Sequence, residues 1–204
     1  YVYDHKLTDK THLKIETLGG IKTLDLTVEN GVVTNIRANI SKPIFESDKI
    51  PVNTNKDKFI MEDVEILDKT FKLSSLSWGN PHTVLFVDDV ANFDVAKYGP
   101  AIECKTDVFP KKTNVTFAQI VDKNYIKIRE WERGTGETIG CGTGCSTAVV
   151  MASTLGLTDR ICKVEQIGGI LEIEYAENGE LFMKGPSNFV FESEIDVSHI
   201  IGGE

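Results

Sequence analysis

The residues best suited to chemistry lie in a glycine-rich stretch at residues 132–145, which reads ERGTGETIGCGTGC. The stretch joins a strand expected at 125–131 to a run at 148–155 that is apolar on nearly every side and therefore predicts a buried helix. Cys141 consequently lies at or just before the first turn of a helix, inside a glycine-rich turn. A thiol in that place is a candidate for acid/base or nucleophilic chemistry.

The start of a helix favours negative charge, because its first backbone N–H groups are unpaired and its dipole is positive there. We therefore expect the Cys141 thiol to ionise more easily than a free thiol. The amides of Gly142, Thr143 and Gly144 can hold a carboxylate or a phosphate beside it. The competing interpretation is a small apolar core residue. We favour that interpretation for Cys145, one helical turn later, and chemistry for Cys141.

The composition is that of an ordinary globular protein and excludes several function classes. The chain has 204 residues, of which 41% are hydrophobic and 26% are charged, with a net charge of -9. The negative charge argues against a nucleic-acid partner, and no apolar run is long enough to span a membrane. Four scattered histidines and one close cysteine pair do not make a metal site. Four cysteines also suggest no disulfide scaffold, so we expect a reducing, cytoplasmic location.

Hydrophobic periodicity predicts a chain rich in strands and poor in helices. Strands are expected at 13–17, 21–28, 32–40, 71–77, 83–87, 114–121, 125–131, 162–167, 170–175, 181–184 and 189–195. A short helix is expected at 95–104. The polar residues 42–68 are expected to form a long irregular excursion between two domains.

An internal repeat indicates duplication. Residues 14–21 (KIETLGGI) resemble residues 163–170 (KVEQIGGI), and the turn Glu-Asn-Gly at 29–31 recurs at 177–179. Turns favour such residues in any case, but two matches in the same order favour a repeat. If a pseudo-two-fold axis relates the copies, a second helix and a second site cysteine belong upstream of Tyr1. We therefore expect this chain to lack the front of its first domain.

Four segments of the sequence resemble the diaminopimelate epimerase family over essentially the whole chain. The stretch around Cys141 resembles the family's second cysteine motif, and the family's first cysteine motif is absent. The other three are Gly79-Asn80-Pro81-His82, Phe109-Pro110-x-x-Thr113-Asn114-Val115, and Gly185-Pro186 followed by Phe189-Val190-Phe191.

The resemblance implies an α+β fold of two pseudo-symmetric domains, each a curved mixed sheet or barrel around a central helix. Residues 1–65 would be the remainder of the first domain, 66–187 the second domain, and 188–204 a closing strand that returns to the first. It also implies a cytoplasmic, homodimeric isomerase of lysine biosynthesis. Such an enzyme converts LL- to meso-diaminopimelate with no metal and no organic cofactor, and this truncated form would have little activity.

The same resemblance assigns roles to individual residues. Cys141 would be one of two acid/base groups on opposite faces of the α-carbon, one thiolate and one thiol. His82 and Glu132 would lie near the reacting centre, where they would support ionisation of the cysteine and meet the substrate ammonium. The backbone amides of Gly142 and Thr143 would bind the α-carboxylate of the substrate. The distal amino-acid end would be bound by Asn80, Asn114 and Arg133.

Simpler interpretations and other functions remain open. His82 alone could be a satisfied half-buried histidine, and Glu132 with Arg133 a solvated pair. A proline or hydroxyproline racemase would use a similar cysteine pair without needing Asn114 and Arg133. A non-catalytic amino-acid-binding module would keep only the carboxylate-binding amides.

Overall fold

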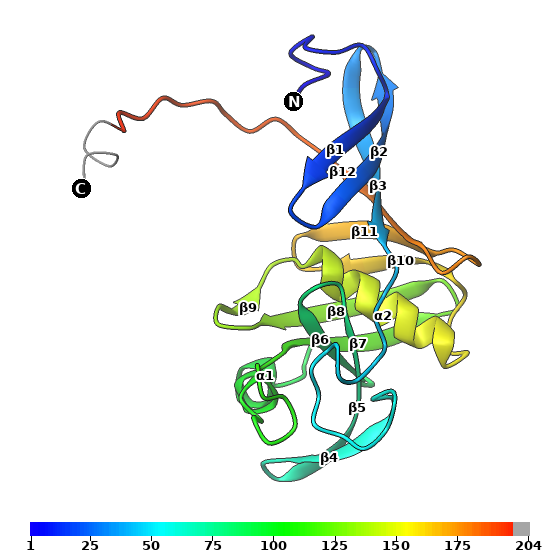
Figure 1. Ribbon diagram of the computed structural model, residues 1–204, viewed down its shortest axis with the longest axis vertical. Coiled ribbons are helices and arrows are strands. Elements are labelled where there is room, and N and C mark those ends of the chain that lie inside the picture. Colours follow the sequence, from blue (N-terminus) through cyan, green and yellow to red (C-terminus); the bar gives the residue numbers. More distant parts are fainter. Residues whose placement is uncertain (198–204) are drawn as a thin grey trace.

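The structure is a computed structural model that describes residues 1–197 (Figure 1). Its helices are α1 (Val95–Glu103) and α2 (Gly142–Thr154). Its strands are β1 (His12–Thr17), β2 (Gly20–Glu29), β3 (Val32–Ser41), β4 (Glu62–Ile66), β5 (Lys69–Ser77), β6 (Pro81–Phe86), β7 (Asn114–Asp122), β8 (Tyr125–Glu132), β9 (Gly136–Thr138), β10 (Ile161–Gln166), β11 (Gly169–Tyr175) and β12 (Leu181–Pro186).

The strands of the described residues form one 12-stranded mixed sheet. Its order is β1-β2-β3-β12-β11-β10-β8-β7-β6-β5-β4, and β9 pairs with β8 off this path. The β6–β7 and β8–β10 pairs are parallel, whereas the other neighbours are antiparallel. The expected α+β class is confirmed. The sheet is open rather than closed into a barrel, because β1 and β4 lie at opposite ends of the path.

The two copies of the repeat form hairpins with the same register. Leu13 pairs with Leu24 in β1–β2, and Cys162 pairs with Ile173 in β10–β11. Both residues of the second pair lie 149 positions after their counterparts in the first pair (13 to 162, 24 to 173). The third strands of the copies, β3 and β12, pair with each other. In Figure 1 the first copy, β1 to β3, extends from the end of the molecule away from α1. The division at residue 65 stays a prediction.

The chain end differs from the sequence prediction. Residues 187–197 contain no strand, so the strand expected at 189–195 is wrong, and residues 198–204 lie outside the described residues. The strand that joins the first copy is instead β12. Residues 187–192 lie beside the apolar face of β1 to β3, and together with residues 1–4 they line a groove of about 440 Å³. These residues border the face without entering the sheet, and Phe189, Val190 and Phe191 remain 58%, 83% and 73% exposed.

The segment at 42–68 is less irregular than its polarity suggested, since it contains β4. Its apolar residues Ile50, Phe59 and Val64 are buried in a hydrophobic cluster that also contains residues of α1. The average polarity of the segment predicted an irregular loop, because it gave little weight to these few buried apolar residues. Burial of individual apolar side chains decides the path of such a segment.

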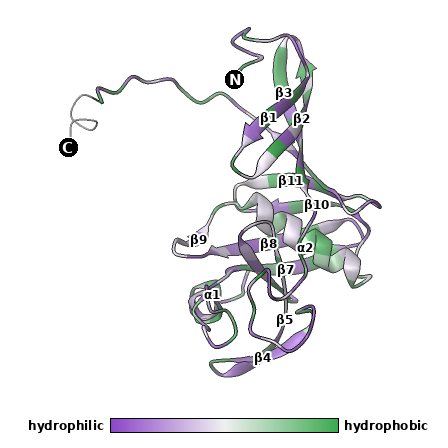
Figure 2. Cartoon of the chain, viewed as in Figure 1, coloured by the Kyte–Doolittle hydropathy of each residue, from purple (hydrophilic) through white to green (hydrophobic). Residues whose placement is uncertain are grey.

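Helix α2 forms the centre of a second hydrophobic cluster. Every residue from Gly144 to Ala152 is buried, and α2 contacts β6, β7, β8, β10 and β11. Figure 2 shows the later turns of α2 as hydrophobic and its first turn as paler. The predicted buried helix is confirmed, and it begins at Gly142, directly after Cys141 as expected. Burial of its later turns fixes the position of its polar first turn.

Candidate active site

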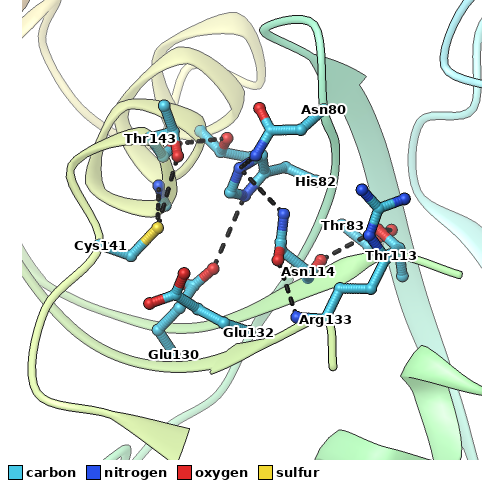
Figure 3. Close-up of polar contacts among 12 residues, drawn as sticks. Asn80, His82, Thr83, Thr113, Asn114, Glu130, Glu132, Arg133, Cys141 and Thr143 are labelled. Atoms are coloured by element: carbon cyan, nitrogen blue, oxygen red, sulfur yellow. Dashed lines mark hydrogen bonds and ion pairs between the residues drawn. The ribbon is translucent and has the colours of Figure 1, made fainter. Parts of the chain in front are cut away.

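The candidate site lies where three neighbouring strands have their ends. His82 near the start of β6 pairs with Asn114 at the start of the parallel strand β7. Strand β8 runs antiparallel to β7, with Val115 opposite Trp131, so the end of β8 lies at the same edge. The first turn of α2 lies there as well (Figure 3). This topology brings together segments that are about 30 to 60 residues apart in the sequence.

Cys141 is the N-cap residue of α2, as its position in the sequence predicted. Its Sγ accepts a hydrogen bond from the Gly144 N–H at 3.4 Å and lies 3.4 Å from the Thr143 hydroxyl. Its own N–H donates to the Gln166 side-chain oxygen at 2.8 Å, and this bond ties the turn to β10. The cysteine is partly exposed, whereas Cys145 is fully buried as expected.

The expected ease of ionisation of Cys141 is wrong. Burial, followed by the negative charge of Glu130 and, more weakly, that of Glu132, raises the pKa of the thiol from 9.0 to about 11. Hydrogen bonds from Thr143 and Gly144 oppose the shift but do not reverse it. The helix start favours the thiolate only modestly, while desolvation and a nearby carboxylate both disfavour it. The resting form of Cys141 is therefore the thiol.

Glu130 is the residue that the sequence analysis missed. Its side chain is only 2% exposed, and neither carboxylate oxygen has a hydrogen-bond partner among the described residues. Alternation along β8 places Glu130 on the same face as Ile126 and Ile128, which pack under α2. That alternation was visible in the sequence, but it did not show that the first turn of α2 covers this position.

His82 is completely buried, and its hydrogen bonds determine its tautomer. The Asn114 side-chain oxygen accepts from the Arg133 N–H at 2.8 Å, and its amide nitrogen donates to the Pro81 carbonyl at 3.0 Å. The same nitrogen and that of Asn80 lie 3.3 and 3.1 Å from His82 Nε2. Because a backbone donor and a backbone carbonyl fix the Asn114 amide, His82 Nε2 must accept.

The neutral ring of His82 therefore carries its proton on Nδ1. This atom has no hydrogen-bond partner among the described residues, and it lies 3.6 Å from the Glu130 Oε1. Figure 3 shows His82 between the two asparagines and the carboxylate. The predicted site histidine thus has its acceptor nitrogen bound by amides and its N–H directed at Glu130.

The other predicted side chains lie at the same edge. Glu132 is partly exposed and accepts a hydrogen bond from the Thr138 hydroxyl at 2.6 Å. The exposed Arg133 donates from its guanidinium to the Lys111 carbonyl at 2.9 Å. In Figure 3 this guanidinium lies on the far side of Asn114 from Cys141. The structure therefore separates a cationic end of the site from the thiol end.

Helix α1 anchors the loop that follows β8. The buried Glu103 accepts hydrogen bonds from Trp131 Nε1 at 2.8 Å and from the Gly134 N–H at 3.1 Å, and it pairs with Lys112. Burial alone would raise the pKa of Glu103, but these three partners hold it below its usual value. Glu103 thereby ties the end of β8 and the loop that follows Glu132 to helix α1.

Gly142 and Thr143 begin α2, and the first amides of a helix lack intrahelical partners and can bind an anion. A Cβ at position 142 would lie 2.6 Å from the Met183 sulfur, so the turn approaches β12 as closely as glycine permits. Among the described residues no group of three or more histidine, cysteine or acidic side chains could hold a metal ion, and no helix is long and apolar enough to cross a membrane. The set comprises a thiol, anion-binding amides, a neutral histidine and a distal guanidinium. These groups suit proton transfer at a carbon beside a carboxylate.

Comparisons with solved structures identify the fold. A probable proline racemase from Agrobacterium radiobacter has a TM-score of 0.72 at 14% identity, and the match covers 98% of this chain and 66% of that one. A hydroxyproline epimerase from Agrobacterium vitis has a TM-score of 0.61 at 11% identity, over 94% and 62% of the two chains. At these identities the likeness shows that the fold is shared.

Sequence comparisons are more specific. The sequence model of the family described as diaminopimelate epimerase matches residues 74–190. Diaminopimelate epimerases from Methanococcus maripaludis and Acetivibrio thermocellus are each 43% identical to this chain, over 199 and 202 residues. These matches cover 97% and 98% of this chain and 71% of each relative. The chain therefore belongs to the diaminopimelate epimerase family, whose members are isomerases.

Proposed function

We propose that Cys141 is one of two acid/base groups that invert the α-carbon of LL-diaminopimelate to give the meso isomer. One base removes the α-proton from one face, and Cys141 returns a proton to the other face. The reverse reaction exchanges these roles. The observation that carries the proposal is the position of Cys141 as N-cap of α2, beside amides that can bind the α-carboxylate.

The amides of Gly142 and Thr143 stabilise the carbanion that develops beside this carboxylate. They are part of the helix backbone, so they need no rearrangement during the reaction. In this proposal Glu132 meets the substrate ammonium. Asn80, Asn114 and Arg133 bind the distal amino-acid end in this proposal, since a guanidinium suits a carboxylate.

The second base is, in this proposal, a cysteine from a segment outside these 204 residues. The other three cysteines of the chain do not fit the role, since Cys145 and Cys162 are buried and Cys104 lies beyond the end of α1. The chain alone should therefore have little activity. We further propose that the complete protein is a cytoplasmic homodimer that acts in lysine and peptidoglycan-precursor synthesis, and its kinship with diaminopimelate epimerases supports the pathway.

The test measures turnover of LL- and meso-diaminopimelate, with proline as the alternative substrate. It compares this chain with a version extended to the length of its relatives, each with and without Cys141→Ser. Cys104→Ser is the matched control. We expect the extended protein, but not the present chain, to turn over diaminopimelate and not proline. Cys141→Ser should abolish this turnover, whereas Cys104→Ser should not. Turnover of proline, or full activity of Cys141→Ser, would refute the proposal.

A further inference from the structure

Glu130 is a buried carboxylate to which the proposed reaction gives no role. Its two oxygens have no hydrogen-bond partner among the described residues, and its side chain is 2% exposed. Burying an unpaired carboxylate is unfavourable, and an unpaired buried polar group in a folded protein needs a physical explanation. Its surroundings supply one.

The first turn of α2 lies directly against this carboxylate. A Cβ on Gly144 would overlap the Glu130 carboxyl group, so the helix approaches Glu130 as closely as glycine allows. The Gly144 N–H is also the donor to the Cys141 sulfur. On its other side Glu130 faces the protonated Nδ1 of His82 at 3.6 Å (Figure 3). Glu130 thus lies against Gly144, which donates to Cys141, and against His82 itself.

We propose that Glu130 is a positioning residue that keeps Cys141 in its thiol form and orients the ring of His82 through its Nδ1–H. The proposal deepens the proposed function, because it concerns the same cysteine. Glu130 acts through these two residues and does not itself meet substrate, since both of its oxygens are shielded.

The other ionisable groups around this pair are His82 from β6, Glu132 from β8 and Cys145 from α2. His82 is neutral, Glu132 is partly exposed and bonded to Thr138, and burial raises the pKa of Cys145 well above its usual value. Glu130 is therefore the dominant charge at Cys141, and its effect on the pKa of that thiol exceeds the effect of Glu132.

This arrangement suits a two-direction proton transfer. When Cys141 acts as the acid, its S–H bond breaks and a C–H bond forms on the substrate. A thiolate then remains beside the Glu130 carboxylate. The repulsion between these two charges makes that thiolate a stronger base. A stronger base suits the next step, in which the thiolate removes a weakly acidic α-proton and becomes a thiol again.

The test is the pH dependence of alkylation by iodoacetamide, followed by mass spectrometry of the peptides containing Cys141 and Cys104. The exposed Cys104 is an internal reference in the same sample. A pKa of about 11 leaves roughly one part in a thousand of Cys141 ionised at pH 8, against about a quarter of a free thiol. We expect Cys141 to react on the order of one hundred-fold more slowly than Cys104 at pH 8, with a midpoint near pH 11.

Glu130→Gln should lower the midpoint of Cys141 and raise its rate at pH 8, by about tenfold for each pKa unit that the midpoint falls. Glu130→Asp keeps the charge and should retain the high midpoint. Glu137→Gln is the matched control, since it removes the same charge from the exposed position of β9, where the carboxylate pairs with Arg129, and it should leave the midpoint of Cys141 unchanged.

An ordinary midpoint for Cys141 in the unaltered protein would overturn the proposal, whether or not the variants fold. A low rate with an ordinary midpoint would mean restricted access and would overturn it too. So would a midpoint that is unchanged in Glu130→Gln. The assay needs no diaminopimelate, so its outcome is separate from that of the turnover experiment.

Discussion

Replacing Asn114 tests the hydrogen-bond network that orients His82. Asn114→Ala removes three contacts, to the Pro81 carbonyl (3.0 Å), to His82 Nε2 (3.3 Å) and from the Arg133 N–H (2.8 Å). Asn114 is 6% exposed, and a buried polar group that loses its partner costs about 1–3 kcal/mol. Arg133 is exposed, so water can satisfy its N–H in part.

We therefore expect Asn114→Ala to lower the free energy of unfolding in urea by about 2–3 kcal/mol. Asn188→Ala, at an exposed position on the tail, is the control and should stay within about 0.5 kcal/mol. If Asn114→Ala also changed the free energy of unfolding by less than about 0.5 kcal/mol, the hydrogen bonds of Asn114 would not stabilise the ends of β6, β7 and β8 as described.

Asn114→Asp separates the contribution of the amide nitrogen from that of the oxygen. The aspartate can still accept from the Arg133 N–H, but it places an acceptor against the Pro81 carbonyl and His82 Nε2. We expect His82 to carry a proton on Nε2 in this variant and on Nδ1 in the unaltered protein. Nitrogen NMR of the histidine ring distinguishes these forms. A proton on Nε2 in the unaltered protein would refute the tautomer assignment.

Two further predictions concern the support of the site. Gly99→Ala places a Cβ 2.6 Å from the Trp131 ring, so it should lower the free energy of unfolding, measured by thermal unfolding, by about 1–2 kcal/mol. Gly142→Ala meets only the flexible end of the Met183 side chain and should cost less. Equal losses in the two variants would contradict this contrast. Because the pKa of Glu103 is lower in the folded protein than its usual value of 4.5, the charged Glu103 stabilises the fold above pH 4.5, and this stability is lost as the pH falls through the pKa of the folded state. The loss of unfolding free energy caused by Glu103→Gln should therefore be smaller below pH 4 than at pH 7. A deficit in urea unfolding that is independent of pH would show that the charge of Glu103 does not matter.

Local patterns in the sequence predicted local structure well. The alternation and the Gly-Gly turns of the repeat predicted both hairpins, and their registers agree residue by residue. The apolar run after Cys141 predicted the buried helix. The strand expected at Phe189–Ile195 was wrong because the alternating pattern does not bury its apolar side chains there: Phe189, Val190 and Phe191 are 58%, 83% and 73% exposed. β9 was missed because three residues are too few to show a period.

The electrostatics of the site could not be predicted in the same way. The position of Cys141 at a helix start followed from its neighbours, and the rule for helix starts predicted a low pKa. The actual direction depends on Glu130, whose burial results from the packing of α2 over β8 and from the approach permitted at Gly144. That contact joins residues 14 positions apart on two elements, and no spacing rule describes it. The hydrogen bonds of His82 likewise depend on which strands lie side by side.

The most direct test of the central claim, that Cys141 is one of two bases, is the isotope content of early product in D2O. The protein extended to the length of its relatives is given LL-diaminopimelate, and the first few per cent of conversion are analysed by mass spectrometry. Two bases on opposite faces predict that the meso product carries deuterium at the inverted carbon while the remaining substrate keeps its protium. Cys141→Ser should give no inverted product. Product that retains the original protium would indicate a single base and would contradict the account.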